Sequence, residues 1–128
     1  MILNHNGTKP IYVQIAEWLE TEILAETIKQ HEKVYSQYQL AEMFNINPAT
    51  AAKGLNLLAD EEIVYKKRGL GMFVSINAKE RITTKRKNQT LKQLVYDLVL
   101  EGKRLHVEEQ ELYEMIAEAI RVLEEEGQ

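Results

Sequence analysis

Three stretches in the first half of the chain place apolar residues at steps of three and four, the spacing of a helix with one buried face. The first runs from Pro10 to about Thr27, the second from Ser36 to Phe44 and the third from Pro48 to Asp60. Gly54 lies in the middle of the third stretch, where glycine costs about 1 kcal/mol of helix propensity relative to alanine. We therefore predict three packed helices, with Gly54 at a close approach to the first or second.

Helix-terminal signals separate the second helix from the third. Gln39 follows Ser36 by three residues, which is the spacing of a capping box. Asn45 stands where a helix commonly ends on a left-handed residue, and asparagine tolerates that conformation. Asn47 precedes Pro48, so an N-cap residue is followed by proline at the first helical position. The connection between the two helices is short, as a helix-turn-helix requires.

Alternation replaces the helical spacing after the third helix. Residues 63–68 predict one strand and Met72–Val74 the returning strand, with Gly69 and Gly71 at the positive-φ positions of the reversal. Lys66, Lys67 and Arg68 place three cations at the tip. A helix with a bare polar face beside a cationic hairpin is the layout of a winged helix-turn-helix, which binds duplex DNA. The alternative is a small α+β domain with a solvated basic turn.

Two amphipathic helices follow the predicted wing. The first begins at Ala78 and is expected to stop at Gly102, and the second runs from Glu108 to Glu126 after a turn at Leu105–Val107. A lone helical hairpin buries two apolar stripes poorly, so a second copy is expected to complete a four-helix arrangement. The alternative is a hairpin that folds back on the N-terminal domain. The predicted dimer seam consists of Leu91, Leu94, Val95, Leu98, Leu112, Met115, Ile116, Ile120 and Leu123.

The predicted fold class is therefore mainly α with a small β-wing (α+β). Residues 1–76 are expected to form the winged helix-turn-helix domain, preceded by a weakly ordered arm from Met1 to Lys9. Residues 77–128 are expected to form the helical dimerisation hairpin. Two helices per chain frame no enclosed pocket of their own, so the sequence leaves open whether a small-molecule effector binds.

Charge is segregated along the chain, although the net charge is −4. Between Ile63 and Lys92, nine cations accompany one acid, Glu80. Residues 108–128 carry eight acids and one cation, Arg121. Because the local field rather than the net charge attracts a phosphate backbone, the basic stretch favours a nucleic-acid partner. A solvated basic helix face is the alternative interpretation.

Other chemistry is poorly represented in the sequence. The chain has no cysteine, and it has no motif of a nucleotide-binding loop, a serine hydrolase or a zinc protease. His31 stands alone, which favours a loop histidine over a metal ligand or a pH sensor. No apolar run approaches the roughly 20 residues that span a bilayer, and Met1–His5 does not resemble a signal peptide. We therefore expect a cytoplasmic protein that is not an enzyme and needs no cofactor or metal.

Several segments in order resemble the GntR family of bacterial repressors. They are Pro10–Ala16, the pair Tyr38–Ala41 and Ile46–Thr50, and Lys67–Val74, and the start of the third helix is most similar to the YtrA subfamily. The resemblance implies a winged helix-turn-helix repressor that binds DNA as a homodimer, and control of a transporter operon. The alternative function is a winged-helix adaptor that docks a protein partner without sequence-specific DNA binding.

The expected DNA-binding residues lie at the starts of the second and third helices and in the wing. Tyr38, Pro48, Ala49 and Ala52 replace arginines that are common in the family, so Lys53 is the only cation in the third helix. Bidentate reading of guanine by arginine is therefore unavailable there. The predicted DNA-binding residues are Ser36, Gln37, Tyr38, Asn47, Pro48, Ala49, Thr50, Lys53, Lys66, Lys67, Arg68, Gly69 and Gly71.

Overall fold

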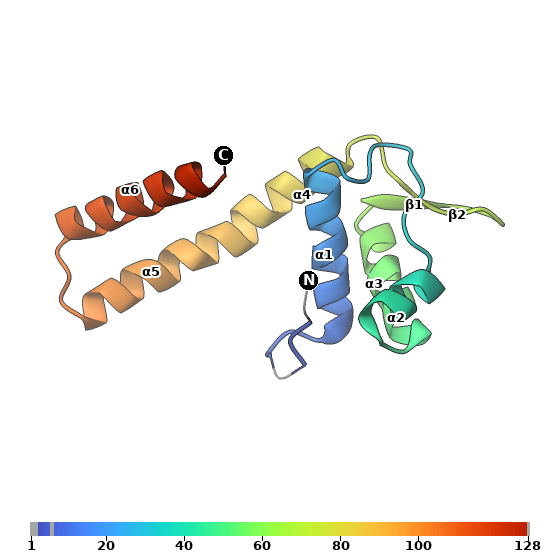
Figure 1. Ribbon diagram of the computed structural model, residues 1–128, viewed down its shortest axis with the longest axis horizontal. Coiled ribbons are helices and arrows are strands. Elements are labelled where there is room, and N and C mark those ends of the chain that lie inside the picture. The colour runs from blue at the N-terminus through green and yellow to red at the C-terminus, as the bar shows by residue number, and fades with distance from the viewer. Residues whose placement is uncertain (1–2, 6, 128) are drawn as a thin grey trace. The chain divides into compact units, whose positions relative to one another are not determined.

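The protein folds into two compact units, Met1–Lys85 and Arg86–Gln128. The structure is a computed structural model and describes residues 3–5 and 7–127. The first unit holds three helices, a two-stranded antiparallel sheet and most of a fourth helix (Figure 1). Its elements are α1 (Ile11–Leu24), α2 (Gln37–Phe44), α3 (Pro48–Asp60), β1 (Val64–Lys67), β2 (Gly71–Val74) and α4 (Ala78–Arg86). The predicted class, mainly α with a small β-wing, is confirmed.

The three predicted helices pack around one apolar core. Side chains from α1, α2, α3 and α4 are fully buried in it, among them Ile15, Leu19, Leu40, Leu58 and Ile82. The first helix ends at Leu24, earlier than the predicted Thr27, because Glu26 adopts a left-handed φ of 60°. Figure 1 shows α1 and α3 side by side, with α2 across the lower end of α3.

The predicted caps of α2 and α3 are confirmed. The Ser36 hydroxyl accepts the Gln39 N–H at 3.1 Å, and the Gln39 side chain accepts the Ser36 N–H at 2.8 Å. Asn45 ends α2 in the left-handed conformation, at φ 53°. The Asn47 carboxamide then accepts the Ala49 N–H at 2.8 Å and opens α3. Local sequence therefore sets both ends of the turn between the two helices.

Gly54 lies where α3 crosses α1. A methyl group at this position would lie 2.8 Å from the backbone oxygen of Tyr12 and 3.2 Å from Cγ2 of Ile15. Only glycine allows the two helix backbones this close. The predicted close approach is confirmed, and the neighbour is the first helix.

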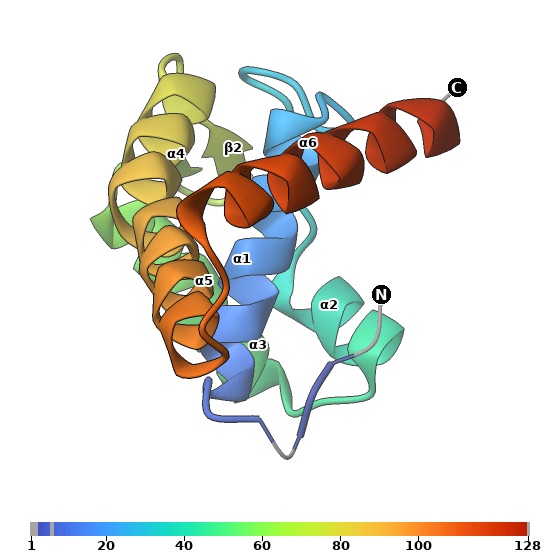
Figure 2. The same cartoon turned by 90° about the vertical axis from the view of Figure 1, so that its left-hand side faces the viewer.

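The described part of the N-terminal arm, which the sequence predicts to be weakly ordered, bonds to α1. The buried Gln14 side chain donates to the backbone oxygens of Asn4 at 2.8 Å and Lys9 at 3.0 Å. It also accepts the Asn4 N–H at 2.7 Å, and Leu3 is buried in the core. Figure 2 shows the arm passing the N-terminal end of α1. Gln14 therefore fixes Asn4 and Lys9 to α1, while Met1, Ile2 and Asn6 of the arm lie outside the described residues.

The wing is a hairpin to which a third segment bonds. β1 and β2 pair antiparallel, with Tyr65 opposite Phe73. Lys33 forms a further antiparallel bridge with Phe73, and the Val34 N–H donates to the Met72 carbonyl at 2.9 Å. The sequence predicted only the hairpin. The segment at Lys33 and Val34 is too short to show the alternation that predicts a strand.

The first compact unit extends beyond the predicted boundary at Ile76. Ala78 and Ile82 on α4 are buried in the core of this unit. Lys85 on the same helix bonds to Glu61 at 3.0 Å and to the buried Glu20. The start of α4 therefore belongs to the winged unit rather than to the C-terminal hairpin, because its few apolar residues face the core.

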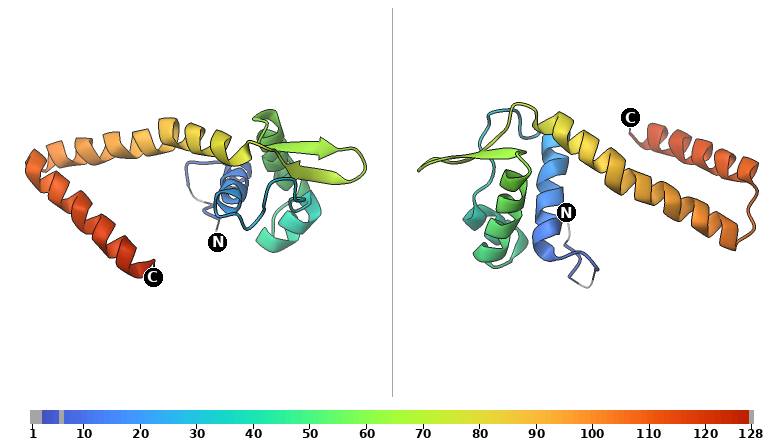
Figure 3. Two further views of the ribbon diagram at one scale, coloured as in Figure 1. Left: turned by 90° about the horizontal axis from the view of Figure 1, so that it is seen from above. Right: turned by 180° about the vertical axis from the view of Figure 1, so that it is seen from behind.

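The second unit is a helical hairpin. It contains a π-helical segment η1 (Lys87–Leu91), α5 (Lys92–Arg104) and α6 (Glu109–Glu126). The predicted stop at Gly102 is wrong: α5 continues to Arg104, and His106 adopts a φ of 56° in the turn. Gly102 is buried, and a methyl group there would lie 3.1 Å from both δ carbons of Leu112. The glycine allows close contact beside the turn, and the two helices diverge from there (Figure 3).

Candidate nucleic-acid interface

The outer face of α3 is open to solvent. Ala49, Lys53 and Asn56 lie on it at steps of four and three and are exposed, and Thr50 beside them is half-buried. Ala51, Leu55 and Leu58 on the opposite face are buried. The exposed face is narrow and carries small or polar side chains, so it can approach the base edges of a major groove closely.

Lys53 is held by an aromatic ring of α1. Its ammonium lies 4.2 Å from the centre of the Tyr12 ring, within cation–π range. Tyr12 is half-buried near the start of α1. The ring attracts the charge without neutralising it, so the cation of α3 keeps its ability to bind an anion.

The N-terminus of α2 presents free backbone donors. The capping box occupies both the hydroxyl and the N–H of Ser36. The N–H groups of Gln37 and Tyr38, in the first helical turn, have no carbonyl partner within the helix. Tyr38 is 69% exposed beside them. Of the predicted residues at this end, Ser36 shapes the helix start, Gln37 is half-buried and Tyr38 is exposed.

The wing turn places its cations in solvent. Lys66, Lys67 and Arg68 are all exposed, and the Leu70 N–H closes the turn on the Lys67 carbonyl at 2.9 Å. Gly69 and Gly71 adopt φ values of 79° and 113°, as the reversal predicted. In Figures 1 and 3 the hairpin projects beyond the helices of its unit.

Ion pairs divide the basic stretch of the sequence into two groups. On α4, Lys79 pairs with Glu26 at 3.4 Å and Arg81 with Glu62 at 3.3 Å. Within residues 3–5 and 7–127, no carboxylate lies at ion-pair distance from the wing cations Lys33, Lys66, Lys67 and Arg68. The wing cations are therefore available to a phosphate backbone, whereas the α4 cations are largely neutralised.

Lys85 is the most tightly held cation of the first unit. Burial lowers the pKa of Lys85, but hydrogen bonds and charge from Glu20 and Glu61 outweigh that effect and raise the pKa above its ordinary value. Glu20 is 1% exposed. This cation fixes α4 to α1 and α3 and takes no part in the exposed basic surface.

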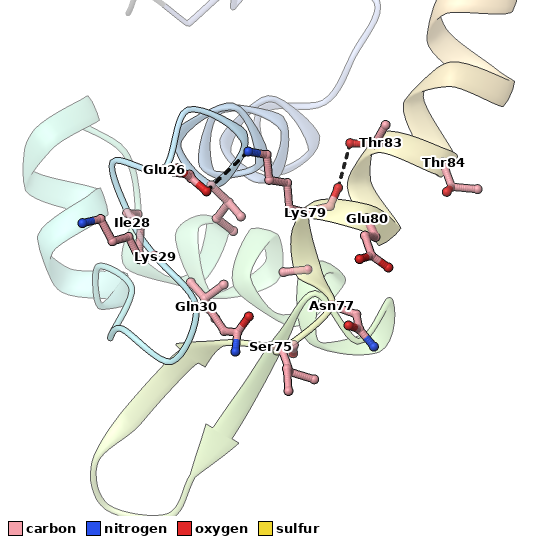
Figure 4. Close-up of a pocket in the computed structure, with 14 residues that line it drawn as sticks. Glu26, Ile28, Lys29, Gln30, Ser75, Asn77, Lys79, Glu80, Thr83 and Thr84 are labelled. Carbon is pink, nitrogen blue, oxygen red and sulfur yellow. Dashed lines mark hydrogen bonds and ion pairs between the residues drawn. The ribbon is translucent and has the colours of Figure 1, made fainter.

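An open hollow lies between the end of α1, the end of β2 and the start of α4 (Figure 4). Its volume is about 920 Å³, and Ile23, Ile28 and Val74 contribute apolar surface to it. Glu26 and Lys79 pair across part of it, and the Thr83 hydroxyl donates to the Lys79 carbonyl at 2.8 Å. The mixed and mutually paired charges of this hollow do not match a polyanion.

Sequence reasoning missed three residues of the exposed surface. Asn56 follows Lys53 by three residues, so helical spacing alone could have placed it on the outer face of α3. Tyr12 and Lys33 lie on other elements and reach the surface through packing, so the spacing within α3 or the wing does not reveal them.

The predicted dimer residues form an open apolar surface on the second unit. Leu98 and Leu112 are half-buried, while the remaining seven are 42–66% exposed. Further apolar side chains missed by the prediction are also exposed, namely Tyr96, Leu100, Tyr113 and Val122. An apolar surface of this extent, when it is exposed to water, is typical of an interaction site.

Comparison with known proteins agrees with this geometry. Residues 11–74 match the family of bacterial regulatory proteins called the gntR family. The chain belongs to the gntR family. Its winged helix-turn-helix is the DNA-binding part of a transcriptional regulator.

Individual gntR-family relatives match most of the chain. It is 29% identical over 116 residues to the HTH-type transcriptional repressor YtrA of Bacillus subtilis, covering 91% of this chain and 88% of that protein. A GntR family transcriptional regulator from Listeria monocytogenes has a similar structure, with a TM-score of 0.71, 27% identity and coverage of 88% of this chain and 97% of that one.

Similar structures include complexes with operator DNA. The DNA-binding domain of AraR in complex with operator ORE1 matches with a TM-score of 0.52 and 25% identity, covering 57% of this chain and 89% of that one.

Among the described residues, no helix is long and apolar enough to cross a membrane. Within the same residues, no group of three or more histidine, aspartate or glutamate side chains is arranged to hold a metal ion.

Proposed function

We propose that this gntR-family protein is a cytoplasmic transcriptional repressor that binds a two-fold symmetric operator as a homodimer. The observation that carries the proposal is the exposed face of α3 beside a wing whose cations have no carboxylate partner among the described residues. The similarity to YtrA of Bacillus subtilis, which is named a repressor, supports the direction of regulation. The resemblance to the YtrA subfamily extends the proposal to a transporter operon.

In the proposed complex, α3 enters the major groove. Thr50, Lys53 and Asn56 face the base edges, with Asn47, Pro48 and Ala49 at the leading end. Asparagine pairs well with adenine, and Ala49 and the Thr50 methyl group suit contact with thymine methyls. Because α3 has no arginine, direct reading of guanine is weak and DNA shape contributes correspondingly more to specificity.

The other predicted residues bind the DNA backbone in this proposal. Gln37 and Tyr38 present helix N-terminal N–H groups to one phosphate. Lys66, Lys67 and Arg68 bind phosphates bordering the minor groove, and Gly69 and Gly71 allow the turn to approach closely.

The exposed apolar faces of α5 and α6 support the homodimer. A single winged domain buries little surface on DNA, and two linked copies read two half-sites at once. A second copy covers the apolar side chains that one chain leaves in water. The seam uses Leu91, Leu94, Val95 and Leu98 of α5 with Leu112, Met115, Ile116, Ile120 and Leu123 of α6.

Binding to the DNA upstream of the protein's own gene tests the function. Footprinting should protect a two-fold symmetric site, and affinity should fall steeply as salt rises because bound phosphates release counterions. Light scattering on the same sample should report a dimer. A chain that binds no duplex at low salt would instead support the protein-adaptor alternative.

A further inference from the structure

One face of the wing combines aromatic and cationic side chains. Residues paired across antiparallel strands point to the same side of the sheet, and residues two apart along a strand do so too. The pairs Tyr65–Phe73 and Lys33–Phe73, and the position of Lys67 two residues after Tyr65, therefore place these four side chains on one side. We call this side the outer wing face. Val64 and Val74 are buried on the opposite side.

Lys33 extends along this face to the wing turn. A methyl group at Gly71 would lie 2.8 Å from Cε of Lys33 and 3.6 Å from its ammonium nitrogen. The lysine stem therefore occupies the space that any other residue at position 71 would fill. Gly71 serves the chain reversal through its φ of 113° and also gives Lys33 access to the wing turn.

Lys67 comes to the same place from β1. It is paired with Gly71 in the strand register. Its ammonium lies 4.7 Å from the centre of the Phe73 ring and 5.9 Å from that of Tyr65. The two rings stack with centres 6.0 Å apart, so they form one aromatic surface beneath Lys67.

Neither lysine has a counter-charge among the described residues. No carboxylate in the described part of the chain pairs with Lys33 or Lys67, although Lys79 and Arg81 of the same unit each have one. The positive charges of Lys33 and Lys67, both beside Gly71, repel each other in the free protein. A bound polyanion would reduce that repulsion. An exposed Lys33 and an exposed Lys67 whose ammonium lies over the Phe73 ring suit binding to a row of phosphates.

We propose that Lys33 joins Lys67 in binding the DNA sugar–phosphate backbone, so that the interface extends from the wing tip along the outer wing face. This inference rests on the proposed function, because it assumes that the chain binds duplex DNA. It adds a residue from the segment between α1 and α2 to a surface otherwise made by the hairpin.

The salt dependence of binding to non-specific duplex tests this inference. Each phosphate contact contributes about 0.9 to the slope of log affinity against log salt. Lys33→Ala should lower that slope by about 0.9 for each protomer that contacts the duplex, whereas Lys33→Arg should keep the wild-type slope. Lys79→Ala is the matched control, because Lys79 is also exposed in the first unit but is paired with Glu26. Thermal melting of each variant checks that the fold is intact.

The outcomes separate this inference from the proposed function. A wild-type slope for Lys33→Ala, together with a lowered slope for Arg68→Ala, would overturn the role of Lys33 and leave DNA binding by the wing in place. Equal losses for Lys33→Ala and Lys79→Ala would also overturn it, because the effect would then follow net charge alone. Failure of the wild-type chain to bind duplex at low salt would remove the proposed function itself.

Discussion

The Lys53 ammonium lies 4.2 Å from the centre of the Tyr12 ring, so the only cation of α3 is supported by α1. A lysine on a helix surface ordinarily samples many rotamers, and ordering it costs up to about 2 kcal/mol of side-chain entropy. The Tyr12 ring reduces that cost before DNA arrives, because the charge already has a preferred position over the ring. In the proposed complex, recognition by α3 therefore depends in part on a residue outside the helix-turn-helix.

Substitutions on α3 should weaken specific DNA binding without unfolding the protein. Thr50→Val removes a hydroxyl and Lys53→Ala removes the cation, and each should lower operator affinity by roughly 1–3 kcal/mol. Tyr12→Leu keeps the lysine and removes the ring, so its effect should be smaller, about 0.5–1 kcal/mol. Fluorescence anisotropy with operator DNA measures all three. Wild-type affinity in both α3 variants would place the recognition surface elsewhere.

Gly54→Ala should destabilise the first unit although alanine favours helices. The added methyl group would meet the Tyr12 backbone oxygen at 2.8 Å, and a backbone in the middle of a packed pair of helices yields little. Overpacking of this kind costs about 1–3 kcal/mol, which exceeds the gain of about 1 kcal/mol in helix propensity. Urea unfolding followed by circular dichroism gives the free energy.

Gly102→Ala is the matched control for this substitution. There the new methyl group faces the flexible end of the Leu112 side chain at 3.1 Å, which can rotate away. It should therefore cost less than Gly54→Ala. The reverse order would show that the α1–α3 contact tolerates separation.

Lys85→Met should strongly destabilise the first unit. It removes the ion pair between Lys85 and the carboxylate of Glu20, which is 1% exposed. Removing one partner of a buried pair costs about 3–5 kcal/mol, and the lower end applies because Lys85 is partly exposed. Glu61→Gln removes the more exposed partner and should cost less than about 1 kcal/mol. Similar stabilities for the two variants would show that Glu20 does not depend on Lys85.

The same lysine predicts a direction of pH dependence. Folding raises the pKa of Lys85 because the favourable effects of Glu20 and Glu61 outweigh burial. A raised lysine pKa gives stability that is fully present below the unfolded value of about 10.4 and is lost as the pH rises through the folded value. The stability difference between wild type and Lys85→Met should therefore be constant at neutral pH and shrink in alkaline solution. Urea unfolding of both proteins across this range measures the difference.

Leu98→Asp combined with Ile116→Asp should give a monomer. Both positions lie on the apolar faces of the second unit, and unpaired carboxylates buried in a seam between two chains are costly. The first unit should stay folded because its core is separate. Operator affinity should collapse while weak non-specific binding survives. Light scattering and a gel shift on one sample measure both properties.

A surface change outside the predicted seam controls for added charge. Arg104→Asp near the turn changes charge without burying it and should leave the dimer intact. A double variant that remains dimeric would place the seam elsewhere. A monomer with wild-type operator affinity would contradict the two-fold mode of binding.

Local interactions made much of this protein predictable from its sequence. The capping box of Ser36 and Gln39, the left-handed Asn45 and the N-cap Asn47 each join residues within three positions of one another, so the residue types reveal the geometry. The positive φ values of Gly69 and Gly71 follow in the same way from the hairpin. The order of elements and the open face of α3 come from these signals together with helical spacing.

Tertiary packing decided which charged and glycine residues serve which role. Lys79, Arg81 and Lys85 belong to one basic stretch of sequence with the wing, yet distant glutamates neutralise them and leave the wing cations without a partner among the described residues. Lys33 reaches the wing because its segment bonds to β2 and crosses Gly71. Gly102 looks like a helix stop but provides room for Leu112. Spacing along a chain reports periodicity, whereas these contacts join residues that only the folded packing brings together.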